Sequence, residues 1–187
     1  EHLELPSARD AVLELTKGKF TTDPRHHTGE GIFFTSRMFD EFALAANDLL
    51  LAHLAEGGDW FIEGAEAGPG TAVTMKIAGD SERTTVEVFD AFTSPDTDGA
   101  AFDVTHVPVG LATYGEENLI SRSQARRVLS RCNLFRRVML DFRGVATIGR
   151  AFADEMFRVF PLEHPDVELV PLHANPEVAR AIAAVRG

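Results

Sequence analysis

The sequence is poor in several residue types, and each shortage excludes a class of protein. Its 187 residues include one cysteine, Cys132, so no internal disulfide can form and a reducing compartment is expected. One cysteine and seven scattered histidines give no spacing typical of a zinc site. No apolar run approaches the roughly 18 residues that a membrane helix needs. We therefore expect a cytoplasmic protein with neither a metal site nor a membrane segment.

Lysine is absent from the C-terminal part of the chain, where arginine replaces it. Residues 106–187 hold 11 arginines against 9 acidic residues, a formal charge of +2. The whole chain carries −11, which leaves −13 on residues 1–105. A change of sign along the chain indicates two units with different surfaces. The acidic part would repel phosphates, so nucleic acid is expected as a partner only through a further domain upstream.

The first half shows helix signals followed by strand signals. Ser7, placed before apolar residues at helical spacing, predicts a helix over 7–20. The strands that follow are predicted on both sides of an Asn47-Asp48 turn, at 59–63 and at 68–78. A connecting helix is predicted at 81–92. The polar segment SPDTDGA after it is the clearest linker, and we place a domain boundary near 93–105.

The stretch TGEGIFFTSRMFDEF, residues 28–42, places two glycines before an apolar segment that predicts a helix. Glycines let backbone N–H groups approach an anion, and a helix N-terminus adds a favourable dipole. Taken alone, however, the G-x-G spacing favours a plainer interpretation, a flexible connection leading into a helix. The surrounding sequence is needed to decide between the two.

Strands and helices alternate regularly in the second half. Strands are predicted at 106–115, 137–142 and 167–172, and helices at 121–132, at 151–160 and after Asn175. Ser121 and Gln124 have the spacing of a capping box, Pro161 is expected to stop the middle helix, and Pro176 suits the first position of the last helix. This alternation predicts a small α/β layer with parallel strands.

KGKFTTDPRHHTGEGIFFTSRMFDEF, with the strands after it and GPGTAVTMKI, resembles the C-terminal half of a histidine-kinase-like (GHKL) ATPase domain. The resemblance implies binding of ATP with Mg²⁺, in the full-length protein, at Thr28, Gly29, Glu30, Gly31, Ile32, Gly70 and Thr71. It also implies that the Mg²⁺-binding Asn, the catalytic Glu and the Asp-x-Gly-x-Gly box lie upstream, and residues 1–27 do not supply them. We therefore expect no catalytic residue and no ATP hydrolysis in the chain as given.

YGEENLISRSQARRVLSRCNLFRRVMLDFRGVATIGRAFADEMFRVF, followed by HPDVELVPLHANPEVARAI, resembles the STAS-like domain of unknown function. The two resemblances imply a mixed α/β chain in three parts. A partial Bergerat-type α/β sandwich, α+β in character, spans residues 1–80, and a connecting helix and linker span 81–105. A compact STAS-like βαβαβα domain spans 106–187.

The expected role is regulation or signalling, in which an ATP-binding module is coupled to a STAS-like protein-interaction domain. Two alternatives remain open. The full-length protein is an ATPase or a protein kinase, or it is a nucleotide-responsive transcriptional regulator with an upstream DNA-binding domain.

Two groups of charged residues are candidates for partner binding. Arg150, Asp154, Glu155 and Arg158 crowd one predicted helix, with Arg150–Asp154 and Asp154–Arg158 spaced to pair. A basic group, formed by Arg122, Arg126, Arg127, Arg131, Arg136 and Arg137, precedes it. A solvated charged face is the plain interpretation of both, and docking of a protein partner is the functional one. For the basic group, nucleic-acid contact is a third interpretation.

Overall fold

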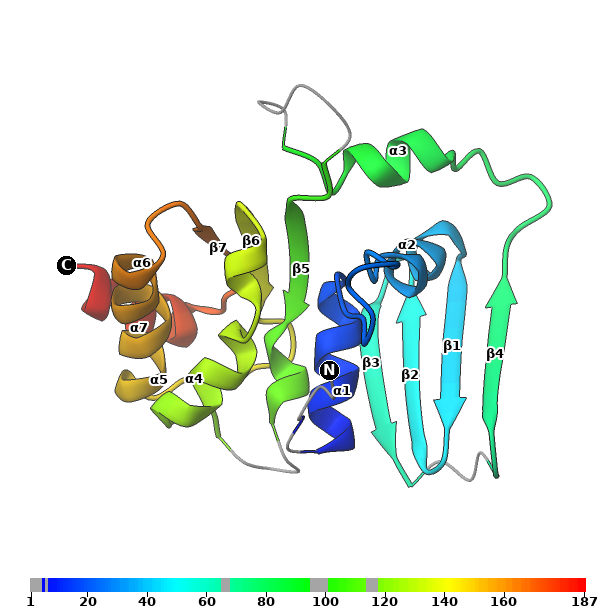
Figure 1. Cartoon of the computed structure of the whole chain (residues 1–187). Coiled ribbons are helices and arrows are strands. Elements are labelled where there is room, and N and C mark those ends of the chain that lie inside the picture. The colour runs from blue at the N-terminus through cyan, green and yellow to red at the C-terminus, as the bar shows by residue number, and fades with distance from the viewer. Residues whose placement is uncertain (1–4, 6, 65–67, 95–100, 114–117) are drawn as a thin grey trace. The chain divides into compact units, whose positions relative to one another are not determined.

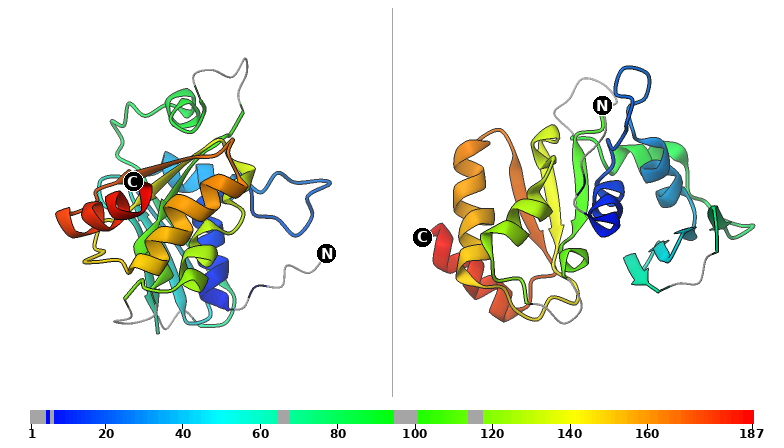
Figure 2. Two further views of the ribbon diagram at one scale, coloured as in Figure 1. Left: turned by 90° about the vertical axis from the view of Figure 1, so that its left-hand side faces the viewer. Right: turned by 60° about the horizontal axis from the view of Figure 1, so that its bottom comes forward.

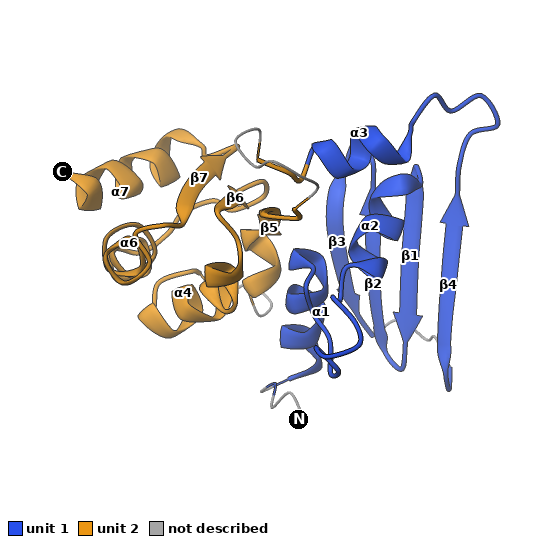
Figure 3. Cartoon of the chain, turned by 45° about the horizontal axis from the view of Figure 1, so that its top comes forward, with its two compact units in different colours: residues 1–91 blue, residues 92–187 orange. Residues whose placement is uncertain are grey.

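A computed structural model describes residues 5, 7–64, 68–94, 101–113 and 118–187. The chain divides into two units, Glu1–Ala91 and Phe92–Gly187, which are coloured separately in Figure 3. The first combines helices with an antiparallel sheet, and the second alternates helices with a parallel sheet. The expected mixed α/β fold class is therefore confirmed.

The first unit begins with α1 (Ala8–Lys17), which Ser7 caps by accepting the N–H of Asp10. The remaining elements are α2 (Gly31–Met38), β1 (Glu41–Ala46), β2 (Leu49–Leu54), β3 (Gly58–Glu63), β4 (Thr71–Lys76) and α3 (Thr85–Asp90). The strands form an antiparallel sheet in the order β3-β2-β1-β4 (Figure 1). Asn47 makes the predicted turn between β1 and β2 with a φ of 56°, a conformation that asparagine adopts readily.

Helices α1 and α2 cover one face of this sheet (Figure 2). Phe42 of β1 and Leu51 of β2 are buried on that face, and Phe33 of α2 is only 1% exposed. Arg9 of α1 lies over the ring of Phe61, 5.0 Å from its centroid. Burial of these aromatic and aliphatic side chains holds the helices to the sheet.

A buried ion pair fixes α2 against the sheet beneath it. The Nη1 and Nη2 atoms of Arg37 lie 2.9 Å and 2.8 Å from the two carboxylate oxygens of Asp59 on β3. His53 of β2 approaches the same carboxylate at 2.9 Å, and the Asp59 side chain is only 2% exposed. Burial opposes ionisation of Asp59, but Arg37 and His53 outweigh it and hold the pKa of that carboxyl below its usual value.

The second unit is built on β5 (Val104–Pro108), β6 (Arg137–Asp141) and β7 (Glu168–Leu172), which pair in parallel in the order β5-β6-β7. Its helical elements are η1 (Val109–Ala112), α4 (Arg122–Leu129), η2 (Cys132–Leu134), α5 (Arg150–Asp154), η3 (Glu155–Val159), α6 (Phe160–Glu163) and α7 (Pro176–Arg186). Helices α4, α5 and α7 lie on the same side of the sheet (Figures 1 and 2). Val138, Leu140, Phe152, Met156 and Val178 form a fully buried core between the helices and the sheet. The predicted alternation of strands and helices is confirmed.

The expectation that Pro161 stops a helix is wrong. Helical structure runs without a break from Arg150 to Glu163, because η3 is a π-helical segment and α6 restarts the α-helical pattern at Phe160. Phe160 donates its N–H to the carbonyl of Glu155, five residues back. Pro161 then falls in the first turn of α6, where a missing N–H is tolerated.

The segment expected to connect the two domains, residues 81–105, is divided between the two units. Helix α3 belongs to the first unit. In the second, the carbonyl of Phe92 accepts the N–H groups of Asp103 and Val104, and Ser94 donates its N–H to the Asp103 carboxylate. Most of the predicted linker SPDTDGA, residues 95–100, lies outside the described residues.

We predict that Asp59→Asn destabilises the first unit by about 2 kcal/mol or more, because it leaves the buried guanidinium of Arg37 without its counter-charge. The folded-state pKa of Asp59 is lowered, so its ionic contribution is complete above the unfolded-state pKa of about 3.9 and disappears as the pH falls through the folded-state value. Urea unfolding of both proteins at several pH values, followed by circular dichroism, measures this. A difference in stability that stays constant below pH 4 would contradict the assignment.

Candidate functional site

An ionic cluster joins α4 to the long helical segment that begins with α5. The predicted Ser121–Gln124 capping box is confirmed: Ser121 Oγ accepts the Gln124 N–H, and the Gln124 side chain accepts the Ser121 N–H. This cap fixes the start of α4, so Arg122 and Arg126 lie one turn apart on one helix face. We call the group formed by Arg122, Arg126, Asp154, Glu155 and Arg158 the ionic cluster.

Glu155 lies at the centre of the ionic cluster. Its Oε1 accepts from Arg126 Nε at 2.6 Å, and its Oε2 accepts from Arg122 Nη1 at 2.9 Å. The Glu155 side chain is 5% exposed, whereas the side chains of Arg122 and Arg126 are 47% and 69% exposed. Burial of Glu155 favours its neutral form, but hydrogen bonds from Arg126 and Arg122 outweigh burial and lower the pKa of this carboxyl. A buried anion therefore anchors two arginines that remain accessible to a partner.

Asp154 extends the cluster along the helix. It accepts from Arg122 Nη2 at 2.6 Å and from Arg158 Nη2 at 2.9 Å, and these hydrogen bonds, that from Arg158 above all, lower the pKa of Asp154. The expected Asp154–Arg158 pair is thus confirmed. The expected Arg150–Asp154 pair does not form, because Arg122 from α4 and Arg158 occupy the Asp154 carboxylate. Arg150 is exposed and makes no ion pair with any described residue.

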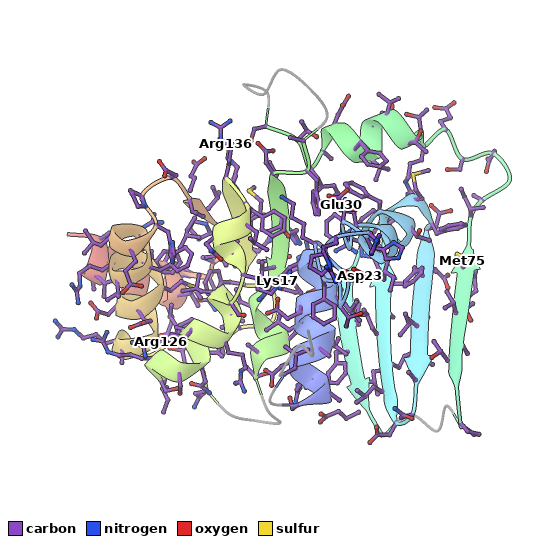
Figure 4. The ribbon with its side chains drawn as sticks, in the orientation of Figure 1. Lys17, Asp23, Glu30, Met75, Arg126 and Arg136 are labelled. Atoms are coloured by element: carbon purple, nitrogen blue, oxygen red, sulfur yellow. The ribbon has the colours of Figure 1, made fainter. Side chains whose placement is uncertain are left out.

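The basic group predicted around α4 is divided among several contacts. Arg127 donates to the carbonyl of Ala112, and Arg137 pairs with Glu168 of β7. The charges of Arg122 and Arg126 are neutralised in part by Asp154 and Glu155 of the ionic cluster. Figure 4 shows Arg126 on α4 and Arg136 near β6, well apart in the second unit. The group is therefore no single basic surface, which weakens the interpretation as a nucleic-acid contact.

The glycine turn of the first unit lies beside a hollow. The predicted helix after it is confirmed as α2, which begins at Gly31. A hollow of about 260 Å³ is lined by Leu15, Phe20, His27, Thr28, Gly29, Glu30, Gly31 and Ile32. Gly70 and Thr71 are not among these residues; they lead into β4, where Thr71 pairs with Ala46. The structure therefore brings Thr28–Ile32 together and leaves the second glycine motif elsewhere.

The two glycines of this turn differ in what they require. Gly29 has a φ of +75°, and a Cβ there would lie 2.5 Å from the backbone nitrogen of Phe20. A Cβ at Gly31 would meet no atom within 4 Å, so its side is open. Only Gly29 is needed for the path of the chain. Glu30, labelled in Figure 4, contributes a carboxylate to the same lining and opposes binding of an unaccompanied anion.

A cluster that the sequence did not reveal lies at the carboxyl end of the parallel sheet. Asp141, the last residue of β6, is 6% exposed, and its carboxylate lies 3.0 Å from His173 Nδ1, 3.1 Å from Arg143 Nη2 and 3.6 Å from His106 Nε2. Burial favours the neutral acid, but the N–H of Arg143 and the side chain of His173 lower the pKa of Asp141. The sequence did contain one signal for this cluster, because Asp141 is a charged residue at the end of a largely apolar strand.

Comparison with known proteins identifies part of the second unit. The profile of the family described as STAS-like domain of unknown function (DUF4325) matches residues 124–179. The match runs from α4 into α7 and includes Asp154, Glu155 and Arg158. No curated protein and no solved structure matches the chain. The predicted STAS-like resemblance is thus confirmed for this segment, and the histidine-kinase-like resemblance of the first half has no support from the comparisons.

Metal-ligand groups and membrane-spanning helices are two further features that would define the kind of site. No three or more histidine, cysteine or acidic side chains come together as metal ligands in the described ranges of the chain. None of the helices in those ranges has both the length and the apolar character that a bilayer span requires. The ionic cluster and the hollow at the glycine turn remain the two sites to which the sequence analysis assigned a role.

Proposed function

We propose that the second unit is a protein-interaction module that docks an acidic partner on the ionic cluster. The observation that carries this proposal is the buried carboxylate of Glu155, which holds Arg122 and Arg126 in place at an exposed surface. The STAS-like match supports it, because the matched residues contain the carboxylates that organise the cluster. With Arg150 and Arg158, this surface has more positive than negative charge on a chain of net charge −11.

Pre-organised arginines suit recognition of carboxylates. An arginine side chain normally loses rotamer entropy when it is immobilised at an interface, and the contacts to Glu155 and Asp154 impose much of that cost before the partner arrives. Among the described residues, Arg126 donates to Glu155 through Nε, and its side chain is 69% exposed, so its terminal N–H groups are available for a second carboxylate. A partner with a cluster of aspartate or glutamate side chains therefore fits this surface.

The hollow at the glycine turn favours a second function, weak binding of ATP with Mg²⁺ in the first unit. Among the described residues no side chain caps the start of α2, and this uncapped helix start together with the open side of Gly31 supports it. Mg²⁺ would offset the repulsion from Glu30. In this proposal the nucleotide state of the first unit changes what the second unit binds, in a regulatory or signalling protein of the cytoplasm. A kinase or ATPase, or a DNA-linked regulator, remains the alternative for the full-length protein.

We predict that Arg126→Glu abolishes partner binding, because it places a negative charge beside Glu155 and faces the partner with repulsion. Arg180→Glu on α7 is the matched control, since the Arg180 side chain is 76% exposed against 69% for Arg126 and its ion pair in the described part of the chain is with Glu177, three residues earlier. Quantitative mass spectrometry of proteins captured by each variant measures the effect. We expect at least one protein that the original chain and the Arg180→Glu variant capture but the Arg126→Glu variant does not. If both variants capture the same proteins as the original chain, the ionic cluster is not the docking surface.

For the first unit, we predict that Gly31→Asp abolishes ATP binding while Gly31→Ala preserves it. A Cβ at position 31 meets no atom within 4 Å, and an acidic residue in the first turn suits the helix dipole, so we expect both variants to fold. Because Gly31 lines the hollow, the Asp variant adds a second negative charge beside Glu30, and this charge repels phosphate. Isothermal titration with ATP and Mg²⁺ tests this, and absence of binding to the original chain, or equal binding by both variants, would contradict the assignment.

A further inference from the structure

In the part of the first unit that the structure describes, no helix of that unit covers the second face of the four-stranded sheet, and this face is mostly apolar. The face opposite α1 and α2 carries Ala43 of β1, together with its register partners Ala52 and Thr74 and every second residue along each strand. We call it the open face. Trp60 and Ile62 on it are 54% and 51% exposed. Its charged residues, Glu41 and Lys76, pair with each other at one end.

The two halves of the open face differ in the size of their side chains. Across β2 and β3, Leu50, Leu54, Trp60 and Ile62 form a ridge of large side chains. Across β1 and β4, Ala43, Ala45, Ala72 and Thr74 form a low floor. The register places Ile62 and Leu50 in one row with Ala45 and Ala72. Trp60 lies in the next row with Ala43 and Thr74, and Leu54 shares the third row with the Glu41–Lys76 pair at the end of the face. A two-fold axis that runs parallel to the strands, midway between the two faces, would lay the ridge of one copy over the floor of another. This is the self-complementarity that an isologous interface needs.

The size of the open face also fits a second copy. Four strands about 4.8 Å apart and six residues at about 3.4 Å each give roughly 400 Å² in projection. Two such faces together bury on the order of 1,000 Å² of accessible surface, near the lower limit of specific interfaces. Sheets packed face to face in this way form a β-sandwich with strands about 30° apart. Exposed apolar patches of this extent on a soluble protein mark interaction surfaces.

We propose that the open face binds the open face of a second copy of this chain, forming a two-fold dimer through sheet-on-sheet packing. The interface is uncharged at its centre, whereas each copy carries a formal charge of −11. Long-range repulsion between copies is screened by salt, and apolar burial is not. The dimer is therefore of moderate affinity and strengthens as the salt concentration rises.

The test compares two lysine substitutions on opposite faces of the same sheet. Ile62→Lys places a charge on the ridge of the open face. Val73→Lys is the matched control, because Val73 is 49% exposed and lies on the other face, paired with Leu44. Sedimentation equilibrium over a wide concentration range is expected to show twice the 20.4 kDa chain mass for the original protein and for Val73→Lys. In Ile62→Lys, dimerisation should weaken on the order of 100-fold, because a charge is buried without a partner.

Trp60 offers a second readout, since it is the only tryptophan of the chain. Its emission should shift to shorter wavelength as concentration rises, in parallel with dimer formation, as the indole leaves water. Matching circular dichroism spectra confirm that both variants fold. A monomer at every concentration, a dimer that Ile62→Lys leaves intact, or equal weakening by both variants would overturn the proposal. Blue-shifted Trp60 emission in the monomer would overturn it too, because another part of the same chain would then cover the face.

Discussion

The packing of α4 and the arrangement of the ionic cluster depend on one buried carboxylate, that of Glu155. Glu155 is removed from water by the helices around it, and an ionised carboxylate in that position is tolerated only because Arg122 and Arg126 donate to both of its oxygens. This requirement fixes α4 against the helical segment from α5 to α6. It also decides which arginines are held in place at the surface and which remain solvated, as Arg150 is. The proposed interaction surface is thus a consequence of how the buried charge of Glu155 is neutralised.

The first unit also contains a buried carboxylate that is neutralised by an arginine from a helix. Asp59 on β3 is buried and is satisfied by Arg37 near the end of α2. Since that contact sets where α2 lies on the sheet, it also sets where the helix begins and hence where the hollow beside Gly31 is found. In both units an arginine on a helix neutralises a buried acid on a different element. Removal of Asp59 would shift α2, and removal of Glu155 would shift α4, so either change would alter the geometry of the candidate site in that unit.

Local patterns in the sequence predicted most helices and strands correctly. They did not predict the contacts between these elements. Ser121 and Gln124 predicted the start of α4 because a capping box is a relation over three residues. The pairing of Arg122 with Asp154 joins residues 32 positions apart, so helix spacing alone suggested Arg150 as the partner instead. The π-helical turn before Pro161 depends on the tertiary packing of the segment and defeats the usual rule for proline. Asp141 and its two histidines meet only when three parallel strands end at one edge.

Hydrogen–deuterium exchange of the chain, with and without its captured partner, tests whether the ionic cluster binds an acidic protein. We expect slower exchange in peptides covering α4 and residues 150–159 when the partner is bound, with little change in α7. Protection confined to other parts of the second unit, with these two segments unchanged, would contradict it.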